Sequence, residues 1–411
     1  MKKLFFLLLI SAALLAQKSN EVSAKIYGFV RFDAAFNSRL VDAARESYFV
    51  FHPYPEELIQ NKEDKNEVPN FNFYSVLTRV GLKLNGPDVL GAKASATIET
   101  DFFGFNDQLM GLLRLRVATI DLNWDKTSLS FGQNWHPMFI SLVPSVASPN
   151  AGTPFQPLGR FPQVKLSYKL DDNFKFIGTL LSQRDFANVG LSNSPDNTQI
   201  RYSLIPNVTL QLEYLKDNNL IGAGVDFKSL IPQTVTSANY KTDKRLNCFS
   251  PWAYLKFDAQ PLTIMAKGVY GQNLTNVMLI GGFGIKSIDP VTKEYEYAPL
   301  NTISGWLDLN YKIDNNLSTG IYVGYSKLLS SSDTLVSVYG RGINTSTKKA
   351  IDNLLRISPR LVYTENNIKI YAQLEMTSAA YGDYQTNHKF ELKNLKTVTN
   401  YNLMLGAMYN F

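Results

Sequence analysis

The chain has 411 residues, which would suit two or three soluble domains of ordinary size or one large closed β-structure. Apolar residues make up 45% of it, aromatic residues 12% and charged residues only 18%. This composition is too aromatic and too weakly charged for a disordered chain, and too polar for a bundle of membrane-spanning helices. The single cysteine, Cys248, excludes an internal disulfide framework and a multi-cysteine metal cluster. No cofactor is expected.

The first 24 residues have the pattern of a secretory signal peptide. Lys2 and Lys3 precede an apolar run over residues 4–16, and a polar stretch then ends in the small residues Ser23 and Ala24. From this pattern we expect cleavage after Ala24. The run is shorter than the roughly 20 residues that span a bilayer, so we do not expect it to anchor the chain as a membrane helix. Residues 1–24 hold three of the 41 Lys/Arg and one of the 35 Asp/Glu, which leaves residues 25–411 a net charge of +4. So small an excess gives no argument for nucleic-acid binding.

Along the mature chain, runs of about ten residues alternate apolar with polar or small residues, which is the period of a strand with one wet face. In the run 26–36, for example, Val30 and Phe32 fall on one face and Arg31 and Asp33 on the other. We find no amphipathic helix pattern of similar strength. Comparable alternation occurs at 78–84, 92–102, 113–117, 208–214, 221–227, 303–311, 317–325 and 368–376.

The connections between these runs are of two kinds that largely alternate, as in outer-membrane barrels with short periplasmic turns and long extracellular loops. The short links are 125–127, 170–173, 206–207, 258–261, 314–316 and 364–367, and the long links are 37–72, 136–161, 183–197, 273–300, 328–352 and 378–398. Aromatic residues where runs meet short links would form an interfacial girdle: Trp124, Tyr168, Phe174, Phe257, Tyr311 and Tyr363.

These patterns predict an all-β fold: one transmembrane antiparallel β-barrel over residues 25–411, in the outer membrane of a Gram-negative bacterium. A barrel whose chain starts and ends on the periplasmic side has an even number of strands. Seventeen runs are visible, and because this number is odd, one strand must have been missed, merged or split. The weak segment Gln233 to Lys241 is the best candidate for an extra strand and would give eighteen strands; sixteen is the alternative. A secreted sandwich would instead have to bury the outward apolar faces against a second sheet. The last strand, ending at Phe411, resembles the segment that the outer-membrane barrel assembly machinery recognises.

Several short motifs resemble the DcaP-like trimeric outer-membrane porins. They are YGFVRFD at 27–33, RVGL at 79–82, IETDFFG at 98–104, LRLR at 113–116 and GQNW at 132–135, while YGQNLT at 270–275 is most similar to the Bacteroidetes branch. The resemblance implies a homotrimer and diffusion of small, preferentially anionic solutes. Family members often carry an N-terminal periplasmic coiled coil. Here the first expected strand follows the cleavage site directly, so trimerisation would use the barrel faces.

In a barrel, the polar face of each strand lines the pore, where charged side chains act on passing ions at short range. Arg114 and Arg116 are the sharpest candidates, because two guanidiniums on one face of one strand can each bind a carboxylate or phosphate. They would form the positive wall of the constriction, or alternatively pair with Glu99 and Asp101 on the adjacent strand and only hold the wall in place. The expected pore-lining set is Arg31, Asp33, Arg79, Lys83, Lys93, Glu99, Asp101, Arg114 and Arg116.

The segment from His136 to Phe161 is unusually apolar for a loop and contains five prolines. We expect residues 136–161 to fold into the lumen and constrict the pore, because an apolar loop is poorly suited to water. The alternative is a cap that packs on a neighbouring subunit.

We therefore expect a porin for passive diffusion of small hydrophilic, anionic solutes, which transports ions through a water-filled channel and contacts lipid and lipopolysaccharide. The alternative is a non-conducting adhesin or structural barrel that uses its long loops, such as the acidic run Glu56, Glu57, Glu63, Asp64 and Glu67. An enzyme is not expected. His52, His136 and His388 fall in expected loops, and no nucleophile-elbow, phosphate-loop or zinc-protease motif occurs.

Overall fold

The computed structural model describes residues 22–184 and 186–411, in which sixteen antiparallel strands close into a barrel. The first strand pairs with the last, Phe29 opposite Asn410, and this pairing closes the wall. In order around the barrel the strands are β1 (Ser23–Asn37), β5 (Arg79–Asn85), β6 (Lys93–Asp101), β7 (Arg114–Asn123), β8 (Thr127–Trp135), β9 (Arg160–Lys169), β10 (Phe174–Leu181), β11 (Asn207–Lys216), β12 (Asn219–Leu230), β13 (Leu246–Ala259), β14 (Leu262–Gln272), β17 (Asn301–Lys312), β18 (Leu317–Leu328), β22 (Lys349–Glu365), β23 (Ile368–Asp383) and β25 (Lys393–Asn410).

Two short segments join the same sheet without adding a strand to the barrel. β4 (Asn70–Tyr74) continues the line of β5, because both pair with successive parts of β1. β21 (Ile343–Asn344) pairs only with the first residues of β22. The expected signal peptide, residues 1–24, lies almost entirely outside the described residues; its last two residues, Ser23 and Ala24, already pair with β5.

The preference for eighteen strands was wrong, and the alternative of sixteen is confirmed. The segment Gln233 to Lys241 contains one isolated bridge, between Val235 and Lys241, and lies in the loop between β12 and β13. It follows Pro232 and lacks an apolar face, so nothing favours its pairing with the wall. The expected short link at 206–207 is likewise the end of a long loop that contains the helix α3 (Thr198–Ser203), and the tight turn lies at 217–218.

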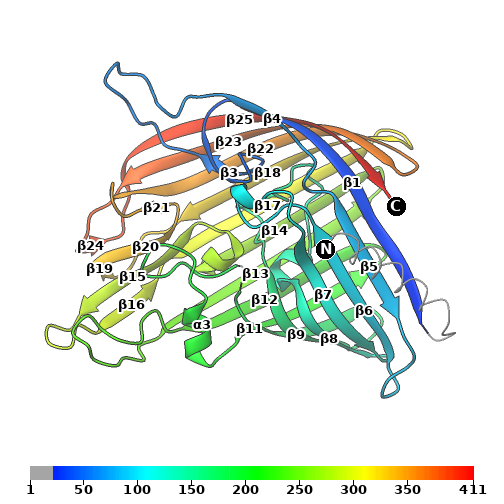
Figure 1. Ribbon diagram of the computed structural model, residues 1–411, viewed down its shortest axis with the longest axis horizontal. Helices are drawn as coiled ribbons and strands as arrows, with labels where there is room; N and C mark the ends of the chain where they lie inside the picture. The colour runs from blue at the N-terminus through cyan, green and yellow to red at the C-terminus, as the bar shows by residue number, and fades with distance from the viewer. Residues whose placement is uncertain (1–21, 185) are drawn as a thin grey trace, which may run out of the picture.

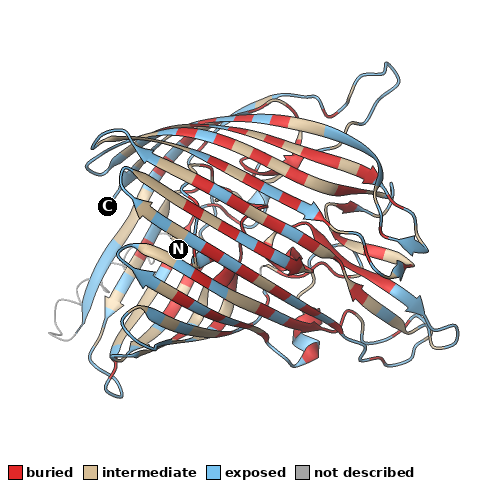
Figure 2. Cartoon of the chain, turned by 180° about the vertical axis from the view of Figure 1, so that it is seen from behind, coloured by how far each residue is buried: buried red, intermediate tan, exposed pale blue. Residues whose placement is uncertain are grey.

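Alternation along the strands sorts the side chains as expected. On β11, Leu210 and Leu212 face outward and are exposed, whereas Gln211 and Glu213 face the lumen and are buried. Figure 2 shows this as stripes along the strands. Lipid offers no hydrogen-bond partners, so a spanning sheet must close and must turn its apolar face outward. Exposed aromatic residues mark the strand ends at the short turns: Tyr168, Phe174, Phe257, Tyr311 and Tyr363.

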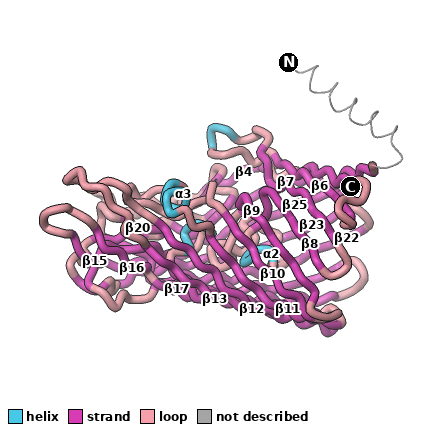
Figure 3. The backbone as a smooth tube through the Cα atoms, turned by 90° about the horizontal axis from the view of Figure 1, so that it is seen from below, coloured by secondary structure: helices cyan, strands magenta, loops and turns pink. Residues whose placement is uncertain are grey.

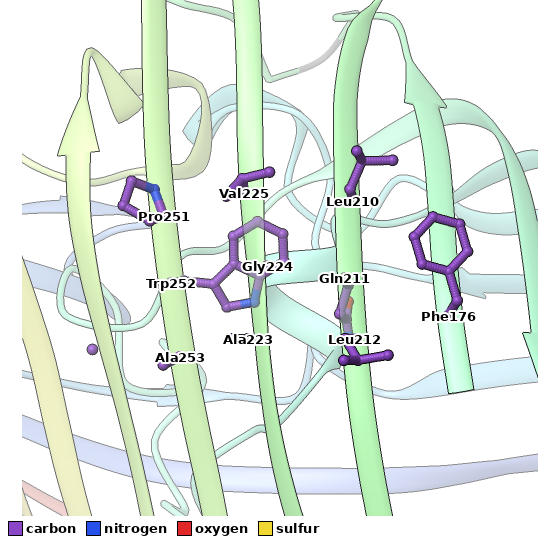
Figure 4. A pocket seen from close by; sticks show the side chains of 11 residues that line it. Phe176, Leu210, Gln211, Leu212, Ala223, Gly224, Val225, Pro251, Trp252 and Ala253 are labelled. Carbon is purple, nitrogen blue, oxygen red and sulfur yellow. The ribbon is translucent and has the colours of Figure 1, made fainter. Parts of the chain in front are cut away.

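One part of the outer wall is hollowed (Figure 4). Ala223, Ala253 and Gly268 lie opposite one another on β12, β13 and β14, and these small residues leave a depression of about 620 Å³. Its rim is apolar, with Leu210, Leu212 and Phe176 on the neighbouring strands. The depression therefore continues the apolar outer surface.

Tight turns lie at one end of the barrel and long loops at the other. The turns at 170–173 and 313–316 are built alike: Asp171 accepts hydrogen bonds from the backbone of Asn173 and Phe174, and Asp314 does so from Asn316 and Leu317. These backbone bonds hold the pKa of both aspartates below its usual value. The short turns mark the periplasmic side, so the long loops are extracellular.

The long loops carry secondary structure of their own. β15 (Gly281–Ile288), β16 (Tyr295–Pro299) and β20 (Ser337–Arg341) form a three-stranded sheet at the loop end, away from the C-terminus (Figure 1). β2 (Val41–Ala44) pairs with β3 (Phe49–Pro53), and β19 (Thr334–Leu335) with β24 (His388–Lys389). The helices are short (Figure 3): η1 (Asp107–Leu109), α2 (Pro137–Ile140), α3 and η2 (Leu274–Val277). No helix in the described part of the chain is long and apolar enough to cross a membrane.

Candidate functional site: a basic cavity in the lumen

The loop between β8 and β9, residues 136–159, lies inside the barrel. Met138 and Phe155 are fully buried, and the loop backbone is bound by side chains from the inner wall on several sides. Lys267 of β14 donates to the carbonyl oxygens of Met138 (2.5 Å) and Leu142 (2.6 Å). Further hydrogen bonds between the wall and this loop include Arg31 to Ala147, Gln373 to Ala147, Trp306 to Gln156, Tyr322 to Gly152 and Asp308 to Ser145. Arg160 and Phe161, which were assigned to this loop, instead begin β9.

A second segment, the hairpin of β2 and β3, also enters the lumen, although the sequence assigned all of 37–72 to an extracellular loop. Every residue of β3 is buried. Tyr48 donates a short hydrogen bond to Asp33 on β1, and Tyr381 of β23 donates to the carbonyl of Pro53 at 2.7 Å. Burial raises the pKa of the Tyr48 hydroxyl well above its usual value, so this group remains a proton donor. The acidic residues from Glu56 to Glu67 lie beyond the hairpin and are mostly exposed.

A cavity of about 420 Å³ remains between these two segments and the wall of β5 to β9. We call it the luminal cavity. Phe49 and Phe51 of the hairpin bound one side, Phe139 and Leu158 of the 136–159 loop another, and Trp135 ends the wall strand β8. Five arginines also line it: Arg45, Arg79, Arg114, Arg116 and Arg160.

Arg114 and Arg116 reach the luminal cavity as ion-paired groups. Arg114 binds Asp101 through two parallel hydrogen bonds of 2.9 Å. Arg116 bridges Glu99 at 2.8 Å and Asp101 at 2.5 Å. A shift of register between Glu99 and Thr100 lets β7 bulge at this point, which buries Arg116 and Val117 together. Arg114 and Arg116 thus pair with Glu99 and Asp101 on β6, as the alternative to a free positive wall supposed, and their guanidiniums also face the cavity.

Positive charge is nevertheless in excess around the cavity. Within the described structure, Glu99 and Asp101 are the carboxylates that form ion pairs with its five arginines, which leaves three positive charges unmatched. Arg79 has only a loose contact with Glu99, 3.6 Å. Arg45 donates to the backbone oxygens of Phe103 and Gly104, and burial together with the charge of Arg114 lowers its pKa.

Arg160 is the least compensated of the five. It is 6% exposed, its Nε lacks a hydrogen-bond partner, and it forms no ion pair with any described residue. Its guanidinium instead lies over the rings of Trp135, at 4.9 Å, and Phe186, at 5.8 Å. Stacking on aromatic faces stabilises a cation but does not neutralise it. Arg160 is therefore a buried positive charge available to an anion in the cavity.

The other expected pore-lining residues lie elsewhere. Arg31 and Asp33 bind each other at 2.6 Å on β1, where Arg31 also anchors the 136–159 loop. Lys83 and Lys93 are exposed near the periplasmic turn between β5 and β6, outside the luminal cavity. The expected set thus divides into a cavity group on β5, β6 and β7, a loop anchor on β1, and two lysines at the periplasmic end.

Sequence analysis missed Arg45 and Arg160. By strict alternation, Arg160 would share the outward face with Val164 and Leu166, but at the first position of β9 it is buried and lines the cavity. Arg45 lies in the infolded hairpin, for which the apolar run Phe49, Val50 and Phe51 was an available signal.

Two of the histidines lie beside aspartates, and His52 also contacts the hydroxyl of Tyr381 at 3.1 Å. His136 caps α2 and lies 3.3 Å from Asp226, and His52 lies 3.2 Å from Asp42. In the described residues no group of three or more His, Cys, Asp or Glu side chains is placed to hold a metal ion. The chemistry that the site offers is electrostatic: a basic, aromatic-lined cavity inside the barrel.

A closed sixteen-stranded barrel with an apolar outer face, infolded loops and a charged lumen has the architecture of an outer-membrane β-barrel protein. Neither a protein-family model nor a curated protein sequence matches this chain. Among solved structures, it is similar to the outer membrane channel DcaP of Acinetobacter baumannii, with 18% identity and a TM-score of 0.72 over 96% of this chain and 99% of that one. The resemblance to DcaP-like porins is therefore confirmed at the level of fold.

Two further porins share the fold more distantly. The anion-selective porin from Comamonas acidovorans has 7% identity and a TM-score of 0.55, covering 95% of this chain and 100% of that one. OmpF of Salmonella typhi, solved with daunomycin, has 13% identity and a TM-score of 0.54, covering 94% and 97%. The fold places this chain in the outer membrane of a Gram-negative bacterium.

Proposed function

We propose that the protein is a porin through which small hydrophilic anions diffuse passively, with the luminal cavity as its selective region. The observation that carries this proposal is the excess of three positive charges around the cavity. Fixed charges beside a narrow aqueous path attract ions of opposite sign and repel those of like sign. The porin from Comamonas acidovorans, a barrel of the same fold, is anion-selective.

In this proposal the 136–159 loop and the hairpin of β2 and β3 constrict the pore, because both occupy the lumen next to the cavity. The loop contacts the inner wall of its own barrel, which favours a constriction over a cap on a neighbouring subunit. Transport requires no catalytic step, so the protein is proposed to be a channel and not an enzyme.

The reversal potential of the purified protein in a planar bilayer under a salt gradient tests this function directly. A stable current with anion preference is expected. Cation preference would refute the role of the arginines while keeping the porin. Absence of current from the folded barrel would favour the adhesin alternative.

We further propose a homotrimer, in which lipid and lipopolysaccharide surround the outer wall. The support is the fold shared with a porin described in trimer form, OmpT of Vibrio cholerae, at 12% identity and a TM-score of 0.54. Light scattering of the detergent-solubilised protein measures the subunit number, and a monomer would overturn this proposal.

Cleavage is proposed after Ala24, which mass spectrometry of the mature N-terminus tests. The C-terminal strand β25, whose outward residues Leu403, Leu405 and Tyr409 precede Phe411, is proposed as the signal for the barrel assembly machinery. Removal of Phe411 should then lower the amount of assembled barrel in the outer membrane without changing synthesis.

A further inference from the structure

One wall residue contacts both infolded segments at once. Arg356 of β22 is fully buried and is the largest such side chain in the described structure. Its guanidinium donates to the carbonyl oxygen of Thr153 in the 136–159 loop at 2.8 Å, and to those of Phe51 and Val50 in the hairpin at 3.0 and 3.2 Å. The two segments are distant in sequence, and this one side chain joins them.

The surroundings of Arg356 strengthen the junction. Its Nε donates to Thr377 on β23 at 2.8 Å, which fixes the plane of the guanidinium. Glu375, also on β23 and also buried, lies 3.7 Å away and balances the charge. Asn150 of the 136–159 loop donates both to Glu375, at 3.1 Å, and to the carbonyl of Val50, at 3.3 Å.

The junction lies directly behind the luminal cavity. Phe51 and Ala151 line the cavity, and Val50, Asn150 and Thr153, which lie one or two residues away along the chain, belong to the junction. A buried carbonyl that loses its donor has to find another partner or return to water. Without the guanidinium, the two segments therefore lose their fixed position on the wall of β22.

We propose that Arg356 is a size-determining residue of the pore: it holds the hairpin and the 136–159 loop together on the wall and so fixes the free cross-section beside the basic arginines. This inference rests on the proposed porin function. The role of Arg356 differs from that of the arginines that select ions, because Arg356 does not line the cavity and acts through the position of two backbone segments.

The test compares the wild-type protein with Arg356→Met and Asn150→Ala in single-channel recordings and in liposome swelling with neutral sugars of increasing size. Methionine keeps the apolar stem of Arg356 but donates no hydrogen bond. Asn150→Ala loosens the same junction from the loop side and replaces no residue of the barrel wall. Lys256→Met is the matched control, since Lys256 is a half-buried cation on the luminal face of β13 whose ion pair is with Asp258, not with an infolded segment.

Arg356→Met should produce a higher conductance level, more current noise and uptake of larger sugars. Loss of even one charge-assisted hydrogen bond should raise the ratio of released to docked segments by about tenfold or more. Asn150→Ala should change conductance in the same direction by a smaller amount, and Lys256→Met should leave the sugar cut-off unchanged.

The outcomes separate this inference from the porin function. If the wild type conducts and both junction variants have its conductance and sugar cut-off, or smaller ones, the role of Arg356 is refuted and the porin stands. If the wild type is silent but the junction variants conduct, the role of Arg356 is supported and the resting pore is closed. If all folded forms are silent, both proposals fail.

Discussion

The replacement Arg160→Met should weaken anion preference without destabilising the barrel. Among the five cavity arginines, it should give the largest loss of anion preference for the smallest loss of stability. Arg160 is buried without an ion-pair partner in the described structure, so its removal strands no carboxylate. Methionine retains contact with Trp135 and Phe186, over which the guanidinium lies. We therefore expect the barrel to assemble and unfold like the wild type, since loss of an uncompensated buried charge is not destabilising.

The magnitude follows from the charge removed. A unit charge about 6 Å from a passing ion contributes about 0.7 kcal/mol in a water-filled space, and screening at 0.1 M salt leaves about 0.4 kcal/mol. This energy raises the local concentration of the anion about twofold and lowers that of the cation about twofold. Removal of the charge should therefore lower the anion-to-cation permeability ratio about fourfold. The effect should shrink further as the salt concentration rises.

The assay is the reversal potential under a salt gradient, measured for Arg160→Met beside Lys93→Met. Lys93 carries the same charge but lies near the periplasmic turn, outside the luminal cavity, so its replacement should change the ratio much less. An unchanged permeability ratio for Arg160→Met, with an intact barrel, would show that the cavity is not where ions are selected. Equal effects of the two variants would assign selectivity to the overall charge of the lumen.

Three further results are expected. Replacement of both Arg114 and Arg116 by Ala should reduce anion preference and also lower the thermal stability of the barrel, because Asp101 and Glu99 lose their partners; unchanged selectivity would exclude these arginines from the selective region. Deletion of Pro144 to Pro154 should increase single-channel conductance, since these residues lie in the lumen, and an unchanged conductance would contradict a constricting role for the loop. The acidic extracellular segment should become more sensitive to protease in acid. Although burial alone would raise the pKa of Asp64, hydrogen bonds from the backbone of Glu57 and Asn66 and from Arg39 lower it, so its stabilising effect is present at neutral pH and is lost as pH falls through that lowered value; Asp64→Asn should remove this pH dependence.

Alternation along single strands predicted much of the face that points into the lumen, although it missed Arg160. It placed Arg31, Asp33, Glu99 and Asp101 inward, as the barrel has them, because the side-chain period of a strand is independent of its partners. The register between strands, in contrast, cannot be predicted from one strand alone. Whether Arg116 meets Glu99 or points freely into the pore depends on the bulge between β6 and β7, which adjacent strands decide together.

Tertiary placement of the loops was the part that sequence reasoning captured least. The five prolines and apolar residues of the 136–159 segment indicated burial, but the residues that bind it, such as Lys267 and Arg356, belong to strands far away in the chain. The hairpin of β2 and β3 carries only a short apolar run between polar stretches, and its burial follows from contacts with Asp33, Tyr381 and Arg356 that no local pattern encodes.

The pairing of β1 with β25 also determines when this protein can fold. Arg31 lies opposite Met408, so the pairing that closes the wall joins residues from the first and the last strand of the barrel. Contacts between such distant residues form slowly, because a long loop must be closed before they contribute any stability. Until the last strand arrives, β1 keeps an open edge that can pair with other chains. The nascent polypeptide must therefore be kept apart from its copies until synthesis and export are complete.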